Sequence, residues 1–187
     1  MDALALLQRR VSVSKLAAPA PSGTDLAQAF AAAVRAADHG KLQPWRFLIV
    51  EGEGLRLLSN VYVDAVRNAN PEVSPAVVEK AQKMTSRAPM IIVAIACPRE
   101  NPGVPRQEQI IACGCATQNL INAFFIQGYG AIWRSGDMTT NPYVKEQLQI
   151  AANEEVIGFV YVGTPVQEIP EPPAIDVSVF YKSWPAK

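Results

Sequence analysis

Several residue types that commonly carry chemistry are scarce in this 187-residue sequence. It holds one histidine, His39, and three cysteines, of which Cys113 and Cys115 lie only two positions apart. A metal centre needs several His, Cys or carboxylate ligands that converge, and a disulfide framework needs paired cysteines. We therefore expect no metal site, and we expect Cys113 and Cys115 to fill apolar space inside the fold.

Charge is also scarce, and its two signs are balanced. Charged residues make up 18% of the chain, with seventeen Lys and Arg against seventeen Asp and Glu. Nucleic acids and anionic membranes attract proteins that carry a local excess of Lys and Arg, so neither partner is favoured. The first residues lack the basic and apolar regions of a signal peptide, so we expect a cytoplasmic protein. Much apolar surface is left to cover, which favours a dimer.

Sequence motifs for common catalytic sites are missing as well. The chain has no Walker phosphate loop, no Gly-x-Gly-x-x-Gly fingerprint and no Gly-x-Ser-x-Gly elbow. Hydrolytic catalysis needs a nucleophile beside an oriented base. His39 could serve as the base, but no serine stands out as its partner, so hydrolytic catalysis is disfavoured.

The sequence does contain a regular series of helical and strand patterns. The unbroken apolar run over 90–96 is typical of a central strand buried on both faces. Further strands are predicted over 46–51, 131–134 and 156–162. Helical spacing predicts helices near the N-terminus and over 26–37, 55–70, 75–87, 106–127 and 142–148. Strands separated by helices, not all in simple βαβ units, indicate an α+β layered domain.

Local signals refine these elements. Asp2 is a candidate cap for the first helix, and Ser22 with Asp25 matches a capping box for the next. That second helix is predicted to include Arg35 in its last turns. The 106–127 helix is apolar on nearly every side, but its Gln and Asn side chains argue against a membrane span, so we expect it to be buried by core elements or a partner subunit. The proline-rich tail over 166–187 must also pack on something.

Three groups of polar residues are candidate binding sites. Arg10 and Ser12 offer a bidentate cation beside a hydroxyl, which suits a phosphate, although a solvated turn would look the same. Arg134, in an Arg-Ser-Gly sequence, offers a similar group, and the alternative is an ordinary strand end. Arg35 and His39 lie in a loop before a strand, where binding residues are common, but a plain helix C-cap also accounts for them.

Taken in order, these segments resemble a known family. The matching motifs are Arg10-x-Ser12, Gln43-Pro44-Trp45, the Gly-Tyr-Gly-Ala-Ile-Trp run over 128–133, and the Ile-Gly-Phe-Val-Tyr-Val-Gly-Thr-Pro run over 157–165. Their sequence and spacing resemble the FMN-dependent nitroreductase family over about residues 2 to 165. Asp38, His39 and the short chain resemble its compact bacterial NAD(P)H nitroreductase branch.

The resemblance implies a fold, an assembly and a function. The fold is a three-layer α+β sandwich with a central, mostly antiparallel sheet flanked by helices, in an intertwined homodimer. One FMN-binding domain spans 1–187, with 166–187 as an extension that packs on the partner subunit. The implied activity takes hydride from NAD(P)H onto flavin N5 and reduces nitroaromatic, quinone or related small acceptors by a ping-pong mechanism. The alternative is a non-catalytic flavin-binding or storage protein whose ring is covered.

Residue roles also follow from the resemblance alone, which places the chemistry on flavin N5 and requires no catalytic side chain. It implies that the segments that contain Arg10 and Trp133 contact the FMN of their own subunit. Arg35 and His39 would reach the FMN of the other subunit. The implied FMN-binding residues are Arg10, Val11, Ser12, Ser14, Arg35, His39, Gln43, Ala131, Ile132, Trp133 and Arg134. The implied nicotinamide-side wall consists of Ile121, Asn122, Ala123, Phe124, Phe125 and Ile126. The chain departs from the family pattern at Val11 and Ser14, where arginines are common, and at Ala37, Asp38 and Lys41.

Overall fold

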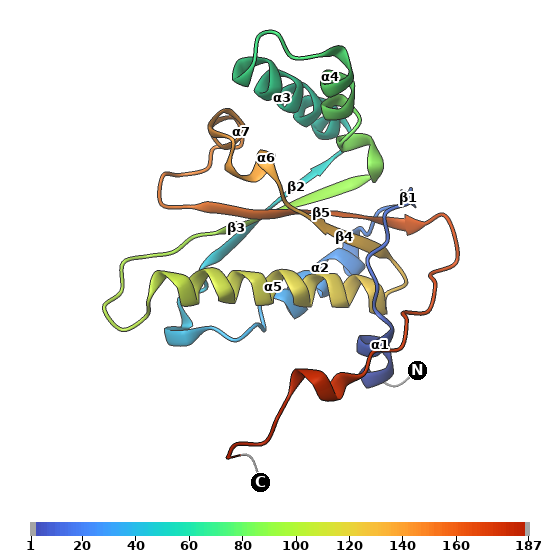
Figure 1. Ribbon diagram of the computed structural model, residues 1–187, viewed down its shortest axis with the longest axis vertical. Helices are drawn as coiled ribbons and strands as arrows, with labels where there is room; N and C mark the ends of the chain where they lie inside the picture. Colours follow the sequence, from blue (N-terminus) through green and yellow to red (C-terminus); the bar gives the residue numbers. More distant parts are fainter. Residues whose placement is uncertain (1–2, 186–187) are drawn as a thin grey trace.

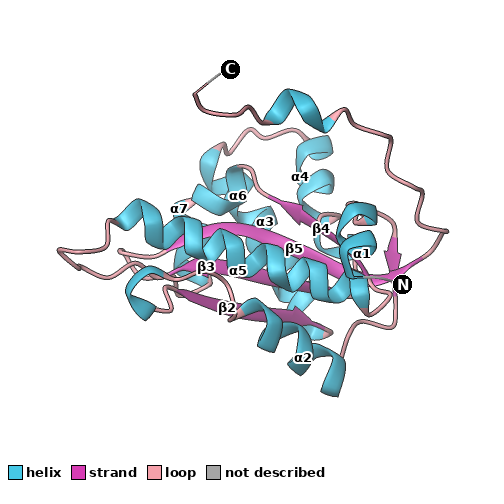
Figure 2. Cartoon of the chain, turned by 90° about the horizontal axis from the view of Figure 1, so that it is seen from below, coloured by secondary structure: helices cyan, strands magenta, loops and turns pink. Residues whose placement is uncertain are grey.

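A computed structural model of the chain, which describes residues 3–185, has three layers (Figures 1 and 2). Helices α2 and α5 cover one face of a central sheet, while α3, α4, α6 and α7 lie over the other. The helices are α1 (Ala3–Arg9), α2 (Gly23–Ala33), α3 (Glu53–Ala69), α4 (Pro75–Gln82), α5 (Arg106–Ile126), α6 (Asp137–Thr140) and α7 (Pro142–Gln147), with short 3-10 turns η1 (His39–Lys41), η2 (Thr85–Arg87) and η3 (Val177–Phe180). This confirms the predicted α+β sandwich.

The sheet is antiparallel at every described pairing. Its strands are β1 (Leu16–Ala17), β2 (Trp45–Glu51), β3 (Met90–Ala96), β4 (Gly130–Arg134) and β5 (Glu155–Pro165). The order is β1-β5-β3-β2, with β4 also paired to β5. β3 therefore lies between β2 and β5, as its unbroken apolar sequence predicts, and all seven of its residues are buried.

Alternation along β3 divides the core into two parts. Ile91, Val93 and Ile95 join a cluster with the α3, α4 and α7 side chains, whereas Met90 and Ile92 join a cluster with α2 and α5. Successive side chains of a strand point to opposite faces, so a run that is apolar at every position serves both layers. The two apolar clusters hold the layers together because each buries side chains from the sheet and from the helices above it.

Helix α5 is buried on one side only. Leu120 and Phe124 are fully buried against the sheet and α2, but Ile111 is 57% and Ile126 53% exposed. By length and composition α5 could cross a membrane, yet its inner face is a core face of this sandwich. Within one chain α5 is therefore covered on its inner face only, and cover of its outer face by a partner subunit stays a prediction. A uniformly apolar sequence carries no signal for which face meets the sheet.

The start and end of α2 differ from the sequence-based predictions. The helix ends at Ala33, and Arg35 lies in the turn that follows rather than in its last turns. Ser22 stands at the N-cap position but its side chain makes no capping hydrogen bond. The Asp25 carboxylate instead accepts a hydrogen bond from the Tyr129 hydroxyl at 2.9 Å, tying the start of α2 to the end of α5. The predicted cap Asp2 lies outside the described residues.

The C-terminal segment runs past α1 and away from the sheet (Figure 1). An ion pair between Arg9 and Glu171, at 3.5 Å, links it to α1. Apolar side chains along it are open to solvent, with Phe180 76% and Trp184 90% exposed. In the single chain, no apolar surface among the described residues covers these side chains.

Candidate functional site

The polar loop that follows α1 lies along the edge of β4. The backbone N–H of Val13 donates to the Ala131 carbonyl at 3.0 Å, so the loop runs alongside β4 at this point. Ser12 and Ser14 are exposed and Arg10 and Val11 are half-buried. A cavity of about 190 Å³ opens here, lined by Ser12, Val13, Ser14, Lys15, Gln167, Glu168, Ile169 and Pro170. The tertiary fold thus brings Ser12 and Ser14, which the sequence selected, into a concave site next to β4.

Trp133 is fixed against the sheet on the α5 face. Its indole N–H donates to the Ile157 carbonyl at 3.1 Å. The ring lies directly over Gly158, where an added Cβ would stand only 1.9 Å from the indole nitrogen. Glycine at this position therefore allows the indole to lie flat on the backbone of β5, and the resulting contacts fix the end of β4 in place.

Arg134 points to the opposite face of β4, over the ring of Tyr161. The guanidinium carbon lies 5.8 Å from the ring centroid, close enough for a cation–π contact. Its Nε is buried and has no hydrogen-bond partner among the described residues. Buried donors are usually paired, so a buried guanidinium N–H without a partner marks a place where a ligand would be accepted.

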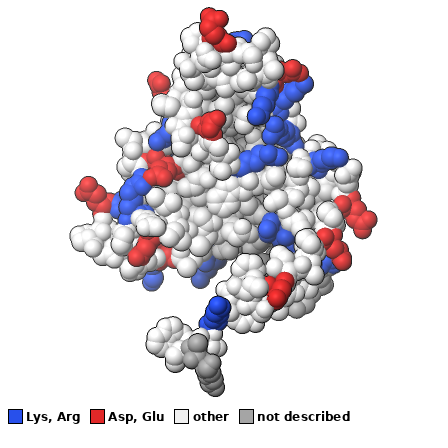
Figure 3. Space-filling view, viewed as in Figure 1, with Lys and Arg blue, Asp and Glu red and all other residues white. Residues whose placement is uncertain are grey.

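A second cavity, of about 320 Å³, lies around Arg134. Its lining is mixed, with two cations, hydroxyls and one carboxylate among apolar side chains, and consists of Val66, Val77, Lys80, Ala81, Met84, Arg134, Ser135, Gly136, Asp137, Met138, Phe159 and Tyr161. Figure 3 shows Lys and Arg side chains gathered between the α3–α4 hairpin and the sheet on this face, while charges elsewhere on it are mixed in sign. The pocket suits a flat, partly apolar ligand with electron-rich edges.

The loop between α2 and β2 carries the other predicted residues, and all of them are exposed. Arg35, His39 and Gln43 face solvent. Its backbone is tightly turned, with left-handed φ at Lys41 and Gln43, and the Asp38 carboxylate accepts hydrogen bonds from two N–H groups of the turn, including that of Gln43 at 2.7 Å. Such strain in non-glycine residues is typical of loops that are held for a function.

These two groups of residues lie far apart within one chain. His39 Nδ1 lies 2.7 Å from the Glu108 carboxylate, in the first turn of α5. The loop over 10–15 lies beside β4, which starts four residues after the last residue of α5. A 21-residue helix spans on the order of 30 Å. Within one chain, residues near opposite ends of that helix are therefore too far apart to contact the same end of a bound ligand.

The segment predicted to form a nicotinamide-side wall is only partly accessible. Ile121 is 5% exposed and Phe124 is fully buried, and both pack in the core with α2. Asn122 and Phe125 are half-buried, and Ile126 is 53% exposed. The face of α5 that is available to another molecule in this segment therefore consists of Asn122, Phe125 and Ile126, with Ala123 at its margin.

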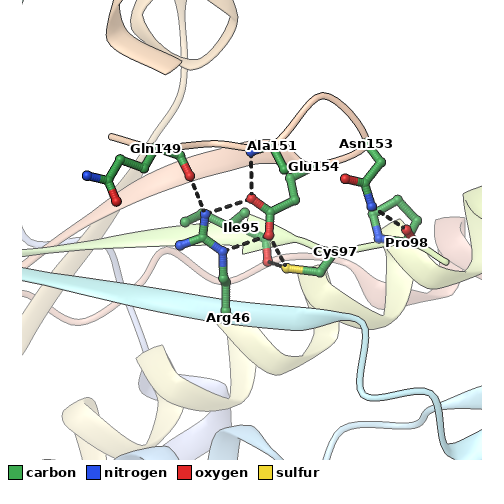
Figure 4. Close-up of polar contacts among 8 residues, drawn as sticks. All are labelled: Arg46, Ile95, Cys97, Pro98, Gln149, Ala151, Asn153 and Glu154. Atoms are coloured by element: carbon green, nitrogen blue, oxygen red, sulfur yellow. Dashed lines mark hydrogen bonds and ion pairs between the residues drawn. The ribbon is translucent and has the colours of Figure 1, made fainter. Parts of the chain in front are cut away.

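A third polar cluster has its groups hydrogen-bonded to one another within the chain. Arg46 of β2 and Glu154 form a bidentate ion pair, and the Cys97 thiol and the Ala151 N–H also donate to that carboxylate (Figure 4). The Arg46 hydrogen bond lowers the pKa of Glu154 to about 2, and burial together with Glu154 raises the pKa of Cys97 to about 12. The thiol is therefore protonated and unreactive at neutral pH. The cluster is structural.

Sequence reasoning missed some residues that the fold brings to these sites. Lys80 of α4 lines the cavity around Arg134, and Glu108 pairs with His39. No local pattern marks either of them, since both are ordinary charged residues on exposed helix faces. The Ser-Gly pair that follows Arg134 was visible in the sequence as part of a cation-hydroxyl-glycine group, and it does line the cavity. Among residues 3–185, no three His, Cys, Asp or Glu side chains converge as a metal site would require.

Comparison with known proteins assigns the chain to a family. The model of the nitroreductase family matches residues 7–164. The Escherichia coli K12 protein named "Putative NAD(P)H nitroreductase YdjA" is 42% identical over 165 residues, which cover 88% of this chain and 89% of that protein. The chain belongs to the nitroreductase family, and the resemblance stated from its motifs is confirmed.

Solved structures share the fold. A nitroreductase-like family protein from Bacillus cereus superposes with a TM-score of 0.81 at 21% identity, covering 98% of this chain and 96% of that one. A variant of the FMN and NADPH-dependent nitroreductase NfnB, from Sphigopyxis sp. strain HMH, gives a TM-score of 0.77 at 16% identity, covering 99% of this chain and all of that one. At these identities the likeness establishes the fold alone.

Proposed function

We propose that this chain is an FMN-dependent oxidoreductase that takes hydride from NAD(P)H and reduces nitroaromatic, quinone or related small acceptors by a ping-pong mechanism. The family assignment and the name of the Escherichia coli relative support an NAD(P)H-linked activity, and the name of NfnB supports FMN. The observation that carries the proposal is the cavity at the end of β4, where the Nε of Arg134 is buried without a partner in the described chain.

The loop over 10–15 suits the phosphate end of FMN. The Arg10 guanidinium can donate two parallel hydrogen bonds to phosphate oxygens, and the hydroxyls of Ser12 and Ser14 can donate one each. Lys15, in the lining of the same cavity, adds a positive charge. By the resemblance, arginines are common at the positions of Val11 and Ser14, and these donors would take their place.

The cavity around Arg134 suits the edge of the flavin ring. A strand rises about 3.3 Å per residue, so Arg134 lies roughly 10 Å along β4 from the point where Val13 meets Ala131. Bound FMN would supply hydride transfer at its ring. Arg134 and Lys80 would stabilise negative charge on the reduced ring, and Met84 and Phe159 would exclude water from it.

We further propose that the active form is a homodimer. If two α5 helices pack antiparallel across a two-fold axis, the first turn of one lies beside the last turn of the other. That arrangement brings Arg35, His39 and Gln43 of one chain to the loop over 10–15 and to β4 of its partner. Ile111 lies on the exposed face of α5 that would be covered, and the partner would also cover the apolar side chains of the C-terminal segment.

The remaining surface of the paired site would receive the substrates. Asn122, Phe125 and Ile126 are the accessible residues of the proposed nicotinamide-side wall. This wall lies on the α5 side of the sheet, whereas the cavity around Arg134 lies on the α3 and α4 side, so within one chain the two do not face each other and the nicotinamide contact stays a prediction. No side chain has to gain or lose a proton during hydride transfer, which agrees with the lack of a nucleophile–base pair. We place the enzyme in the cytoplasm, where reduced nicotinamide is made.

Anaerobic bleaching of the purified protein is the test. Protein purified without added cofactor should be yellow and should release FMN on denaturation. NADH or NADPH, added without oxygen, should remove the flavin absorbance, and a nitroaromatic or quinone should restore it. If neither NADH nor NADPH removes the flavin absorbance, the protein is the flavin-storage alternative. A colourless protein that takes up no added FMN would rule out both functions.

A further inference from the structure

The single histidine of the chain is held by one acidic side chain. His39 Nδ1 lies 2.7 Å from Oε2 of Glu108, although the two residues are 69 positions apart. A carboxylate accepts hydrogen bonds, so the proton of this contact is on Nδ1. Among residues 3–185, Nε2 of the same ring has no partner. The contact therefore leaves Nε2 as the nitrogen that is available to another molecule.

The backbone beneath His39 is fixed as firmly as the ring. Asp38 accepts hydrogen bonds from the N–H groups of Leu42 and Gln43, which closes the turn on itself. Gly40 has a φ of 73°, and an added Cβ there would lie 3.1 Å from Val104, so the turn packs closely against the segment that leads into α5. With the backbone held, the hydrogen bond to Glu108 selects the direction of the imidazole.

The stability gained from this contact does not explain why the turn and the ring are held so firmly. The side chains of His39 and Glu108 are 62% and 50% exposed in the single chain, and pairs of that exposure add little to stability. Three features converge instead on orientation of the ring: the capped turn, the close glycine contact and the short hydrogen bond. In metal sites, a carboxylate on one imidazole nitrogen orients the other nitrogen toward its ligand in this way.

We propose that Glu108 is a positioning residue of the cofactor site, which keeps the proton of His39 on Nδ1 and aims Nε2 at the FMN of the partner subunit. This inference rests on the proposed function, because it assumes that a shared flavin site forms. Glu108 itself does not contact the flavin. Its effect on FMN must pass through His39, and that dependence can be measured.

A double-mutant cycle with FMN tests the dependence. Dissociation constants are measured from the change in flavin fluorescence for the wild type, Glu108→Gln, His39→Gln and the double variant. We expect Glu108→Gln to weaken FMN binding about three- to tenfold, and to have no further effect once His39 is replaced. Glu100→Gln is the matched control, because Glu100 is an exposed carboxylate on the segment before α5 and outside the His39 contact. The control should bind FMN like the wild type.

Nitrogen NMR gives a second readout, because a purely structural contact would not make the Nε2 signal respond to FMN. Because the chain has one histidine, ¹⁵N-histidine labelling yields the signals of one ring. The wild type should show a protonated Nδ1, and the Nε2 signal should shift when FMN is added. Glu108→Ala, which removes the acceptor, should lose the preference for Nδ1, and Glu108→Asp, which keeps a carboxylate, should retain part of it.

The outcomes separate the two proposals. The positioning role is overturned, and the proposed function stands, if the wild type binds FMN and the Glu108→Gln variant binds it equally well. The same holds if Glu108→Gln weakens FMN binding as much in the His39→Gln background as in the wild type. An unchanged Nδ1 preference in Glu108→Ala overturns it as well. If the wild type takes up no FMN at all, the proposed function fails, and this inference fails with it. Thermal unfolding of each variant checks that the fold is retained.

Discussion

Arg46 and Glu154 lie 108 residues apart in the chain and form a bidentate ion pair, with Nε–Oε1 at 2.7 Å and Nη2–Oε2 at 2.6 Å. The pair joins β2 to the segment that precedes β5, across the end of β3. The Glu154 side chain is only 12% exposed, so removal of its charge would leave the guanidinium poorly paired. The contact therefore matters for stability, unlike the ion pairs on the helix surfaces.

The first prediction follows from the pKa of Glu154. Arg46 lowers it from 4.5 to about 2, so the ion pair stabilises the fold fully above the unfolded-state value and this stabilisation is lost as the pH falls toward 2. Glu154→Gln should lower the free energy of unfolding by roughly 2–3 kcal/mol at pH 7. The difference from the wild type should shrink between pH 4.5 and pH 2.

Urea unfolding at a fixed protein concentration, at pH 7, 5 and 3, measures this difference. Glu146→Gln is the control, since Glu146 is exposed on α7. The control should match the wild type at each pH. A difference for Glu154→Gln that is as large at pH 3 as at pH 7 would show that the effect does not come from the charge of the carboxylate.

The second prediction concerns Arg10 and FMN retention. Arg10→Ala should weaken FMN binding by roughly ten- to a hundredfold, because a hydrogen bond to a charged group contributes about 1.5–3 kcal/mol. Flavin content after dialysis, followed by fluorescence titration, measures the loss. Arg67→Ala removes the same charge from an exposed position on α3 and should keep its flavin. Full loading of Arg10→Ala after dialysis would show that Arg10 does not hold the phosphate.

The third prediction tests the contact between Trp133 and Gly158. A Cβ at position 158 would stand 1.9 Å from the indole nitrogen, so Gly158→Ala must displace the ring and break its hydrogen bond to the Ile157 carbonyl. Overpacking of this kind destabilises by about 1–3 kcal/mol. Thermal unfolding should show a lower midpoint for Gly158→Ala but not for Gly103→Ala, where the added carbon meets only an ordinary contact at 3.5 Å. Equal midpoints for the two variants would mean that Trp133 is free to move.

The fourth prediction tests whether the flavin site is shared between subunits. Ile111 is 57% exposed on the outer face of α5, and Ile111→Glu places a charge in the proposed interface. Light scattering should report a monomer for this variant, and the monomer should lose its flavin. Leu57→Glu, on α3, makes the same chemical change at a residue that is 53% exposed and should remain a flavin-loaded dimer. A monomer of Ile111→Glu that keeps its flavin would show that one chain holds a complete site.

Most of the secondary structure could be predicted from the sequence because its causes are local. The apolar run of β3, the proline at the start of α7 and the glycines after α5 act within a few residues of where they stand. The end of α2 was misplaced because its alanines favour helix up to Arg35, while the chain turns after Ala33. The motifs also identified the family, since their order and spacing are properties of the sequence itself.

Only the tertiary structure placed the loop over 10–15 beside β4, put Lys80 near Arg134, and set Glu108 against His39. It also decided which face of α5 meets the sheet and which face stays open. Each of these facts depends on residues that are distant in the chain. Hydrophobic periodicity and capping signals reach only a few residues along the backbone, whereas contacts between layers depend on how every element packs at once.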